Sequence, residues 1–202
     1  MKNLKFKIQN LKFRRCRRQR LGQSILEMIF AIGILLMVGS AVLAITLTNL
    51  TGQRESEFQI IANNLAREGI EVIRNIRDSN WLAEQNWDNG LVDPGGVSHQ
   101  AITQFNAVAN SWQLSFNPVD DDLLSVSAEG VYNHAGNGQK TVFHRRLTLE
   151  NICQAADGTE AVKNFCVAAE IKAGIKVTAN VSWAESGRNR RLIMEDVLYD
   201  WK

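Results

Sequence analysis

The pattern of hydrophobic and polar residues first marks a long, almost uniformly apolar segment. Residues 25–50 contain a single charged residue, Glu27. As a helix rising 1.5 Å per residue, these 26 or so positions extend ~39 Å, enough to cross a hydrocarbon core of ~30 Å. The apolar core of a secretory signal is usually about 7–15 residues, so this segment is too long for one. The pattern predicts a transmembrane helix, to which we assign residues 23–52.

Residues 53–78 change to the pattern of a helix with one buried flank. Their apolar residues recur three or four positions apart along most of the segment, and small or branched residues widen the stripe. Arg67 and Glu71, and likewise Arg74 and Asp78, are spaced as favourable pairs on the polar side. We expect one continuous helix of about 55 residues. The stripe consists of Phe58, Ile61, Ala62, Leu65, Ala66, Ile70, Val72, Ile73 and Ile76.

The remaining positions, 79–202, predict a globular, β-rich domain. Residues 79–110 are rich in turn formers, and we expect a loop there that Trp81, Trp87 and Phe105 attach to the domain. Apolar and polar residues then alternate with a period of two, which favours an antiparallel sheet covered on one side. The expected fold class is α+β, with the amphipathic helix covering the sheet. The clearest alternation is Ile175, Val177, Ala179, Val181 and Trp183, before a hairpin turn at 185–189.

Charge divides the chain at residue 22. Positions 1–22 carry nine Lys or Arg and no acid, and such a bias keeps a leader in the cytoplasm and sends the following domain outward. Without this leader the chain has 14 basic and 21 acidic residues, so we expect no nucleic acid partner. Arg188, Arg190 and Arg191 are interpreted as a solvated turn.

Glu27 is the first candidate functional residue. An ionisable group costs roughly 2.5–3.5 kcal/mol at the centre of a membrane helix and less near an interface, so it is a functional candidate by default. The alternative is an ordinary signal anchor that tolerates an interfacial glutamate.

The segment Gly22-Gln23-Ser24-Ile25-Leu26-Glu27, between the basic leader and the apolar run, resembles the N-terminus of type IV prepilins and type II secretion pseudopilins. In that family a membrane aspartyl protease cuts after the glycine, and a glutamate stands fifth after the cut, as Glu27 does. The resemblance implies removal of residues 1–22, methylation of Gln23 and a role for Glu27 in assembly. Gln23 replaces the usual phenylalanine, and Ala44 stands where many major pilins have proline, which fits a minor component.

The resemblance also implies a pilin-like fold, a location and a set of partners. The chain would be a minor pilin or pseudopilin of a type IV pilus or a type II secretion-like filament. It would cross the cell membrane once, with the N-terminus cytoplasmic, before it joins the filament. Its partners would be the prepilin peptidase, other pilin subunits, an inner-membrane assembly platform and the lipid membrane. The alternative is a single-pass, membrane-anchored binding or sensor domain that does not polymerise.

The cysteines and histidines favour a disulfide over a metal site. Cys16 belongs to the leader, whereas Cys153 and Cys166 belong to the exported domain, where a bridge of ~3 kcal/mol can form. The alternative is two separate thiols. We expect no metal or cofactor, because His99, His134 and His144 are scattered and His134 reads as a turn residue.

The sequence offers no catalytic motif, so we expect a protein that is not an enzyme. The acidic run Asp120-Asp121-Asp122 lacks the spacing of an EF-hand. Some secretion pseudopilins bind calcium, but a solvated turn is the preferred interpretation here.

Overall fold

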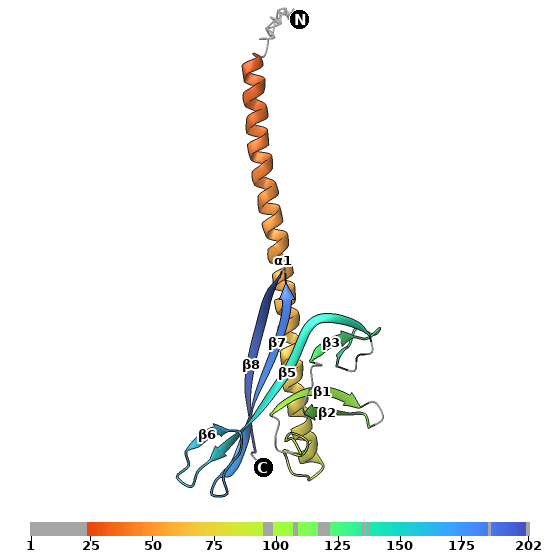
Figure 1. The fold of residues 1–202 in the computed structure, drawn as a ribbon, viewed down its shortest axis with the longest axis vertical. Helices are drawn as coiled ribbons and strands as arrows, with labels where there is room; N and C mark the ends of the chain where they lie inside the picture. Colours follow the sequence, from red (N-terminus) through yellow and green to blue (C-terminus); the bar gives the residue numbers. More distant parts are fainter. Residues whose placement is uncertain are drawn as a thin grey trace, which may run out of the picture. The chain divides into compact units, whose positions relative to one another are not determined.

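The computed structural model describes residues 24–94, 99–106, 109–116, 122–134, 136, 138–185 and 187–200. One helix, α1 (Ile25–Leu82), precedes strands that form a single antiparallel sheet (Figure 1). This is the predicted α+β class, with a long N-terminal helix and a C-terminal sheet. The chain divides into two units, Met1–Leu50 and Thr51–Lys202, which are considered separately below.

Helix α1 continues four residues beyond its predicted end at Asp78. The turn formers Ser79 and Asn80 remain helical, and the Asn80 amide donates hydrogen bonds to the carbonyl oxygens of Trp87 and Asn89. The guanidinium of Arg77 lies 4.5 Å from the centre of the Trp81 ring, which also fastens this last turn. Glu84 then takes a positive φ of 55°, a conformation that typically follows a helix end.

The sheet is organised around its longest strand, β5. Along one edge β5 pairs with β7, and β8 pairs with the far side of β7 as the predicted hairpin. The other edge of β5 is shared by β3, β1 and β6, while β2 and β4 extend β1 and β3. The strands are β1 (Gln100–Asn106), β2 (Ser111–Phe116), β3 (Leu123–Val126), β4 (Tyr132–Asn133), β5 (Gln139–Gln154), β6 (Glu160–Lys163), β7 (Ile171–Glu185) and β8 (Arg188–Tyr199).

The core lies between this sheet and the Thr51–Leu82 part of α1. Every apolar residue of the predicted β7 stripe is buried, and the helix contributes Leu65, Ile70 and Ile73 to the same cluster. The predicted packing of the amphipathic stripe on one face of the sheet is therefore confirmed. Burying this face supplies the main favourable free energy for the domain, because apolar burial dominates folding.

Gly69 and Arg145 lie where α1 approaches the sheet closely. A Cβ atom at Gly69 would lie 2.9 Å from Cδ2 of Leu147, so only glycine fits without a shift. The buried Arg145 guanidinium donates to the carbonyl oxygen of Leu65 at 3.1 Å and to Oγ1 of Thr103 at 2.7 Å. Burial lowers the pKa of Arg145 from its usual value, and Glu68, at 3.4 Å, opposes this change.

Several expectations for the domain are wrong. The segment 79–110 contains strand β1, and Phe105 belongs to that strand and not to a loop. Arg188, Arg190 and Arg191 begin β8, and Arg190 forms an ion pair of 2.5 Å with Glu55. Arg74 pairs with Asp196 and Glu71 in place of Asp78. The polar face of α1 therefore contacts β8 as well as solvent.

Candidate functional site

The first half of α1 exposes its apolar side chains on all sides. Within the described residues, α1 contains a segment long and apolar enough to cross a membrane. Its hydroxyl groups are bonded internally: Ser40 donates to the carbonyl oxygen of Met37 at 2.9 Å, and Thr46 donates to that of Val42 at 2.8 Å. Polar groups in hydrocarbon must find such partners, so the segment suits a lipid environment.

Glu27 lies in the first turn of α1. The carbonyl oxygen of Ser24 accepts the amide N–H groups of Glu27 at 2.9 Å and Met28 at 3.2 Å, so Ser24 is the residue that starts the helix. The spacing Ser24 to Glu27 is that of a capping box, and the positive end of the helix dipole favours a carboxylate there. Local helix chemistry thus stabilises an acid at this position. Gly22, Gln23 and Cys16 lie outside the described residues.

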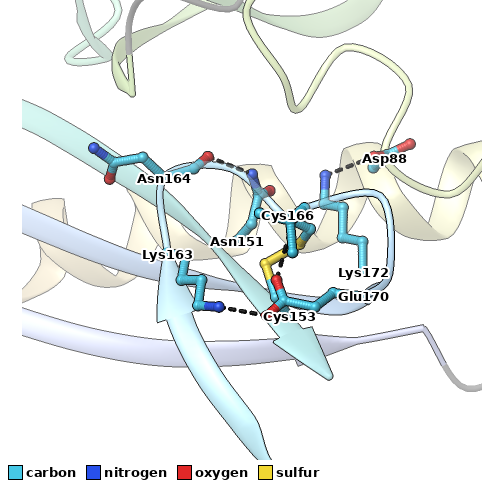
Figure 2. The surroundings of a disulfide bond; sticks show 9 residues. Asp88, Asn151, Cys153, Lys163, Asn164, Cys166, Glu170 and Lys172 are labelled. Atoms are coloured by element: carbon cyan, nitrogen blue, oxygen red, sulfur yellow. Dashed lines mark hydrogen bonds and ion pairs between the residues drawn. A yellow bond between two sulfur atoms is a disulfide. The ribbon is translucent and has the colours of Figure 1, made fainter. Parts of the chain in front are cut away.

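Cys153 and Cys166 form a disulfide bond with their Cα atoms 5.4 Å apart. Cys153 is buried in β5, and Cys166 lies in the connection that follows β6. Figure 2 shows the polar contacts around this bond: the Lys163 ammonium pairs with Glu170, and the Asn151 amide donates to the carbonyl oxygen of Asn164 at 2.7 Å. Nearby, Lys172 of β7 pairs with Asp88 at 2.6 Å. These are the two cysteines for which the sequence favours a bridge.

The sulfur atoms and the carboxylate of Glu170 lie within 4.8 Å of one another, a spacing that a metal site would also need. The sulfurs are bonded to each other, however, and a metal binds the thiolate form. Glu170 is engaged as well, because it accepts the N–H of Val167 at 3.2 Å and pairs with Lys163. The hydrogen bond from Lys163 lowers the pKa of Glu170. The arrangement fits a structural bridge.

His134 lies in the connection between β4 and β5, as its interpretation as a turn residue expects, but its side chain is buried. Its Nδ1 lies 3.1 Å from the carbonyl oxygen of Thr103 in β1, and its Nε2 lies 3.2 Å from that of Arg145 in β5. The imidazole ring thus links β1 and β5 at a position where the two strands are no longer paired with each other. A neutral imidazole donates to one of these acceptors and a protonated one to both. Burial and the charge of Arg145 lower the pKa of His134, and the two carbonyl groups oppose them.

Asp122 is an ion-pair residue and not merely part of a turn. Its carboxylate accepts hydrogen bonds from Nδ1 of His144 at 2.7 Å and from Nη2 of Arg146 at 3.0 Å. Burial alone would raise the pKa of Asp122, but the bond from His144 and the charge of Arg146 hold it below its ordinary value. A carboxylate already engaged by His144 and by the guanidinium of Arg146 is a poor ligand for calcium. Asp120 and Asp121 lie outside the described residues.

The side chains of His134 and His144 are both engaged within the described residues. The ring nitrogens of His134 are engaged by two carbonyl groups, and the Nδ1 atom of His144 is engaged by Asp122. Neither histidine bonds to a serine, threonine or cysteine side chain among the described residues, as a nucleophile and its base would.

Comparison of the chain with protein-family models, curated proteins and solved structures finds no match.

Proposed function

We propose that this chain is a minor pilin or pseudopilin subunit, processed after Gly22 and assembled through its apolar helix into a filament. One observation carries the proposal: Glu27, fifth after Gly22, lies in the first turn of an exposed apolar helix. The nine basic residues before Gly22 and the antiparallel sheet carried by the same helix support it. In this proposal the chain spans the cell membrane once until it leaves for the filament.

The proposed role of Glu27 depends on cleavage. Cutting after Gly22 creates an α-amino group at Gln23, four positions before Glu27 in the sequence. A carboxylate among bundled apolar helices is unfavourable without an opposite charge, and the amine of a neighbouring subunit supplies one. The two charges pair only when they lie at the same height along the filament axis, so their pairing sets the axial register of neighbouring helices. Methylation of Gln23 would leave this charge in place.

Cleavage is tested with Gly22→Val. The added side chain should block a peptidase that accepts only a small residue at the cut, and the precursor should remain in the membrane. Intact mass of the membrane-extracted protein distinguishes the precursor from the mature chain. An anchored domain that never polymerises would retain residues 1–22 in the wild type, which contradicts the proposal.

Assembly is tested with Glu27→Ala, with Glu57→Ala as the matched control in the exposed part of the same helix. Both variants should insert and be cleaved, because Gly22 is unchanged. Only Glu27→Ala should be depleted from sheared filaments, measured as the ratio of filament to membrane protein. Equal ratios for the two cleaved variants would exclude this role for Glu27.

A further inference from the structure

A groove of about 500 Å³ lies between the C-terminal end of α1, the loop that follows this helix, and strand β2. Figure 1 shows the β1–β2 hairpin beside the last turns of α1. The volume is within the range of sites that hold small ligands, about 300–1,000 Å³. The residues that line the groove are Asn75, Ile76, Ser79, Asn80, Gln85, Asn89, Gly90, Ser111, Trp112, Gln113 and Leu114.

This lining is polar but carries no charge. Five of its eleven residues have a carboxamide side chain, two have a hydroxyl group, and none is an acid or a base. Charged residues make up 22% of the whole chain, so an open groove lined without one differs from an average surface. A carboxamide both donates and accepts hydrogen bonds, as a hydroxyl group does. The groove therefore suits a neutral ligand that is rich in hydroxyl groups.

Local hydrogen bonds hold the loop wall in place. The Nδ2 atom of Asn80 donates to the carbonyl oxygens of Trp87 and Asn89, and the Nδ2 atom of Asn89 donates to Oε1 of Gln85 at 3.0 Å. Within the described residues, these bonds leave Oδ1 of Asn80, Oδ1 of Asn89 and Nε2 of Gln85 without a partner. The wall thus offers two acceptors and a donor that are already positioned, which lowers the entropy cost of binding.

The helix wall adds Asn75 and Ser79. These residues are four positions apart in α1, so they lie on the same face of the helix. Both are exposed, and neither side chain has a hydrogen-bond partner among the described residues. Asn75 can donate two hydrogen bonds and accept others, and the hydroxyl group of Ser79 can do both.

Trp112 gives the groove an aromatic surface. Leu114, two residues further along β2 and on the same face, packs against the core cluster that includes α1 residues, so the Trp112 ring lies on the α1 side of the strand. The ring is half-buried and packs edge to face against Phe105, its cross-strand partner, with centres 5.2 Å apart. A sugar ring has an apolar face of C–H groups and hydroxyl groups around its edge, which matches an aromatic ring beside hydrogen-bonding side chains.

We propose that this groove binds a neutral saccharide. One sugar ring stacks on Trp112, and its hydroxyl groups bond to Asn75, Ser79 and the carboxamides of the loop. An apolar molecule would displace water from these polar groups without replacing their hydrogen bonds, which is unfavourable. A charged sugar would enter a lining that supplies no opposite charge. The site does not depend on the proposed filament function.

The first test applies the fluorescently labelled full chain to an array of neutral and acidic oligosaccharides. The detergent is a polyoxyethylene ether, because a glycoside detergent would itself present sugar to the groove. The neutral oligosaccharide that binds most strongly is then labelled and titrated by fluorescence anisotropy, and acidic ones compete with it. We expect the acidic oligosaccharides to bind at least tenfold more weakly. The proposal is overturned if no neutral oligosaccharide binds, or if the acidic ones bind more tightly.

The second test locates the binding site. Asn75→Ala and Trp112→Ala should each weaken binding of the titrated oligosaccharide about tenfold or more, as anchor residues do. The matched controls are Asn64→Ala, at an exposed asparagine of the same helix, and Phe165→Ala, at an aromatic residue that is 56% exposed. Both positions lie outside the groove, so both controls should bind as the wild type does.

Far-UV circular dichroism confirms that the variants are folded. Asn75→Asp is the variant of nearly unchanged size, and it replaces the two N–H donors of the carboxamide by an acceptor. It should weaken binding as Asn75→Ala does. Unchanged binding in the folded Asn75→Ala, Asn75→Asp or Trp112→Ala variant would place the saccharide elsewhere and overturn the proposal, as would an equal loss in the two controls.

Discussion

The two halves of α1 are made from similar residues in opposite surroundings. Leu36, in the first half, is 69% exposed, whereas Leu65, in the second, is 3% exposed. The first half is apolar on every side, and the second confines its apolar residues to one flank. The comparison shows that periodicity, and not the amount of apolar surface, identifies the half that packs on its own chain. An all-round apolar helix needs an external apolar phase to cover it.

The same substitution in the two halves should give the largest contrast. Leu65→Ala removes a buried side chain from the core and should lower the free energy of unfolding by about 2–5 kcal/mol. Leu36→Ala should leave the stability of the exported domain unchanged. All five tryptophans follow residue 80, so their fluorescence during urea denaturation in detergent reports on this domain. Equal urea midpoints for the two variants would show that both halves of α1 contribute equally to the stability of the exported domain.

Glycine gives the second contrast. Gly69→Val places a side chain against Leu147 and should destabilise the domain by about 1–3 kcal/mol through overpacking. Gly39→Val, where nothing lies within 4 Å of the added Cβ, is the control and should leave the domain unchanged. The same denaturation experiment measures both. If Gly69→Val matched the wild type, the close approach of α1 to the sheet would not limit residue size.

The free energy of unfolding should depend on pH only through the sheet region. Because the pKa of His134 is lowered by burial and by Arg145, the unfolded chain takes up this proton more readily than the folded one. The stability contributed by the neutral ring is complete above the unfolded pKa of about 6.5 and is lost as the pH falls through the lower, folded pKa.

Denaturation of the full chain between pH 7.5 and 5 measures this loss. His134→Gln, which does not titrate, should flatten the dependence, and His144→Gln should retain it. The first half of α1 contains no histidine and should keep its helicity across this range. An unchanged pH dependence in His134→Gln would assign the effect to another group.

The smallest expected effect concerns the polar side of the second half. Arg74 donates to Oδ2 of Asp196 from Nε at 3.2 Å and from Nη2 at 2.8 Å, but its side chain is 42% exposed. A double-mutant cycle with Arg74→Ala and Asp196→Ala should give a coupling of about 0.2–1 kcal/mol that declines with added salt. A coupling insensitive to salt would mean that the pair is less solvated than its exposure indicates.

The sequence identifies the elements whose pattern is regular and misses those that depend on distant contacts. The β7 alternation is strict, so its buried face is predictable. Strand β1 is hidden because its inward position 103 is a threonine, which is buried and accepts a hydrogen bond from Arg145. Arg145 itself reads as polar, yet it is buried, and its guanidinium donates to the Leu65 carbonyl oxygen of α1. Pattern alone does not supply such pairings.

The candidate sites also divide into one that residue type predicts and one that depends on distant contacts. The disulfide follows from compartment and residue type, whereas the role of His134 depends on two carbonyl groups from strands distant in sequence. The groove between α1 and β2 was equally hidden, because it exists only where β2 lies beside the end of the helix. Cleavage after Gly22 and the role of Glu27 remain predictions for the experiments above.

The partition of β5 has a consequence for how the domain can vary. One edge of this 16-residue strand is occupied by β7, and the other is divided among three separate short partners. Each short partner occupies its own stretch of β5, so the length of one partner does not fix the register of the next. The β5–β7–β8 meander is then the part under common constraint, and the opposite edge is the place where related chains can diverge and grafted loops can be accommodated.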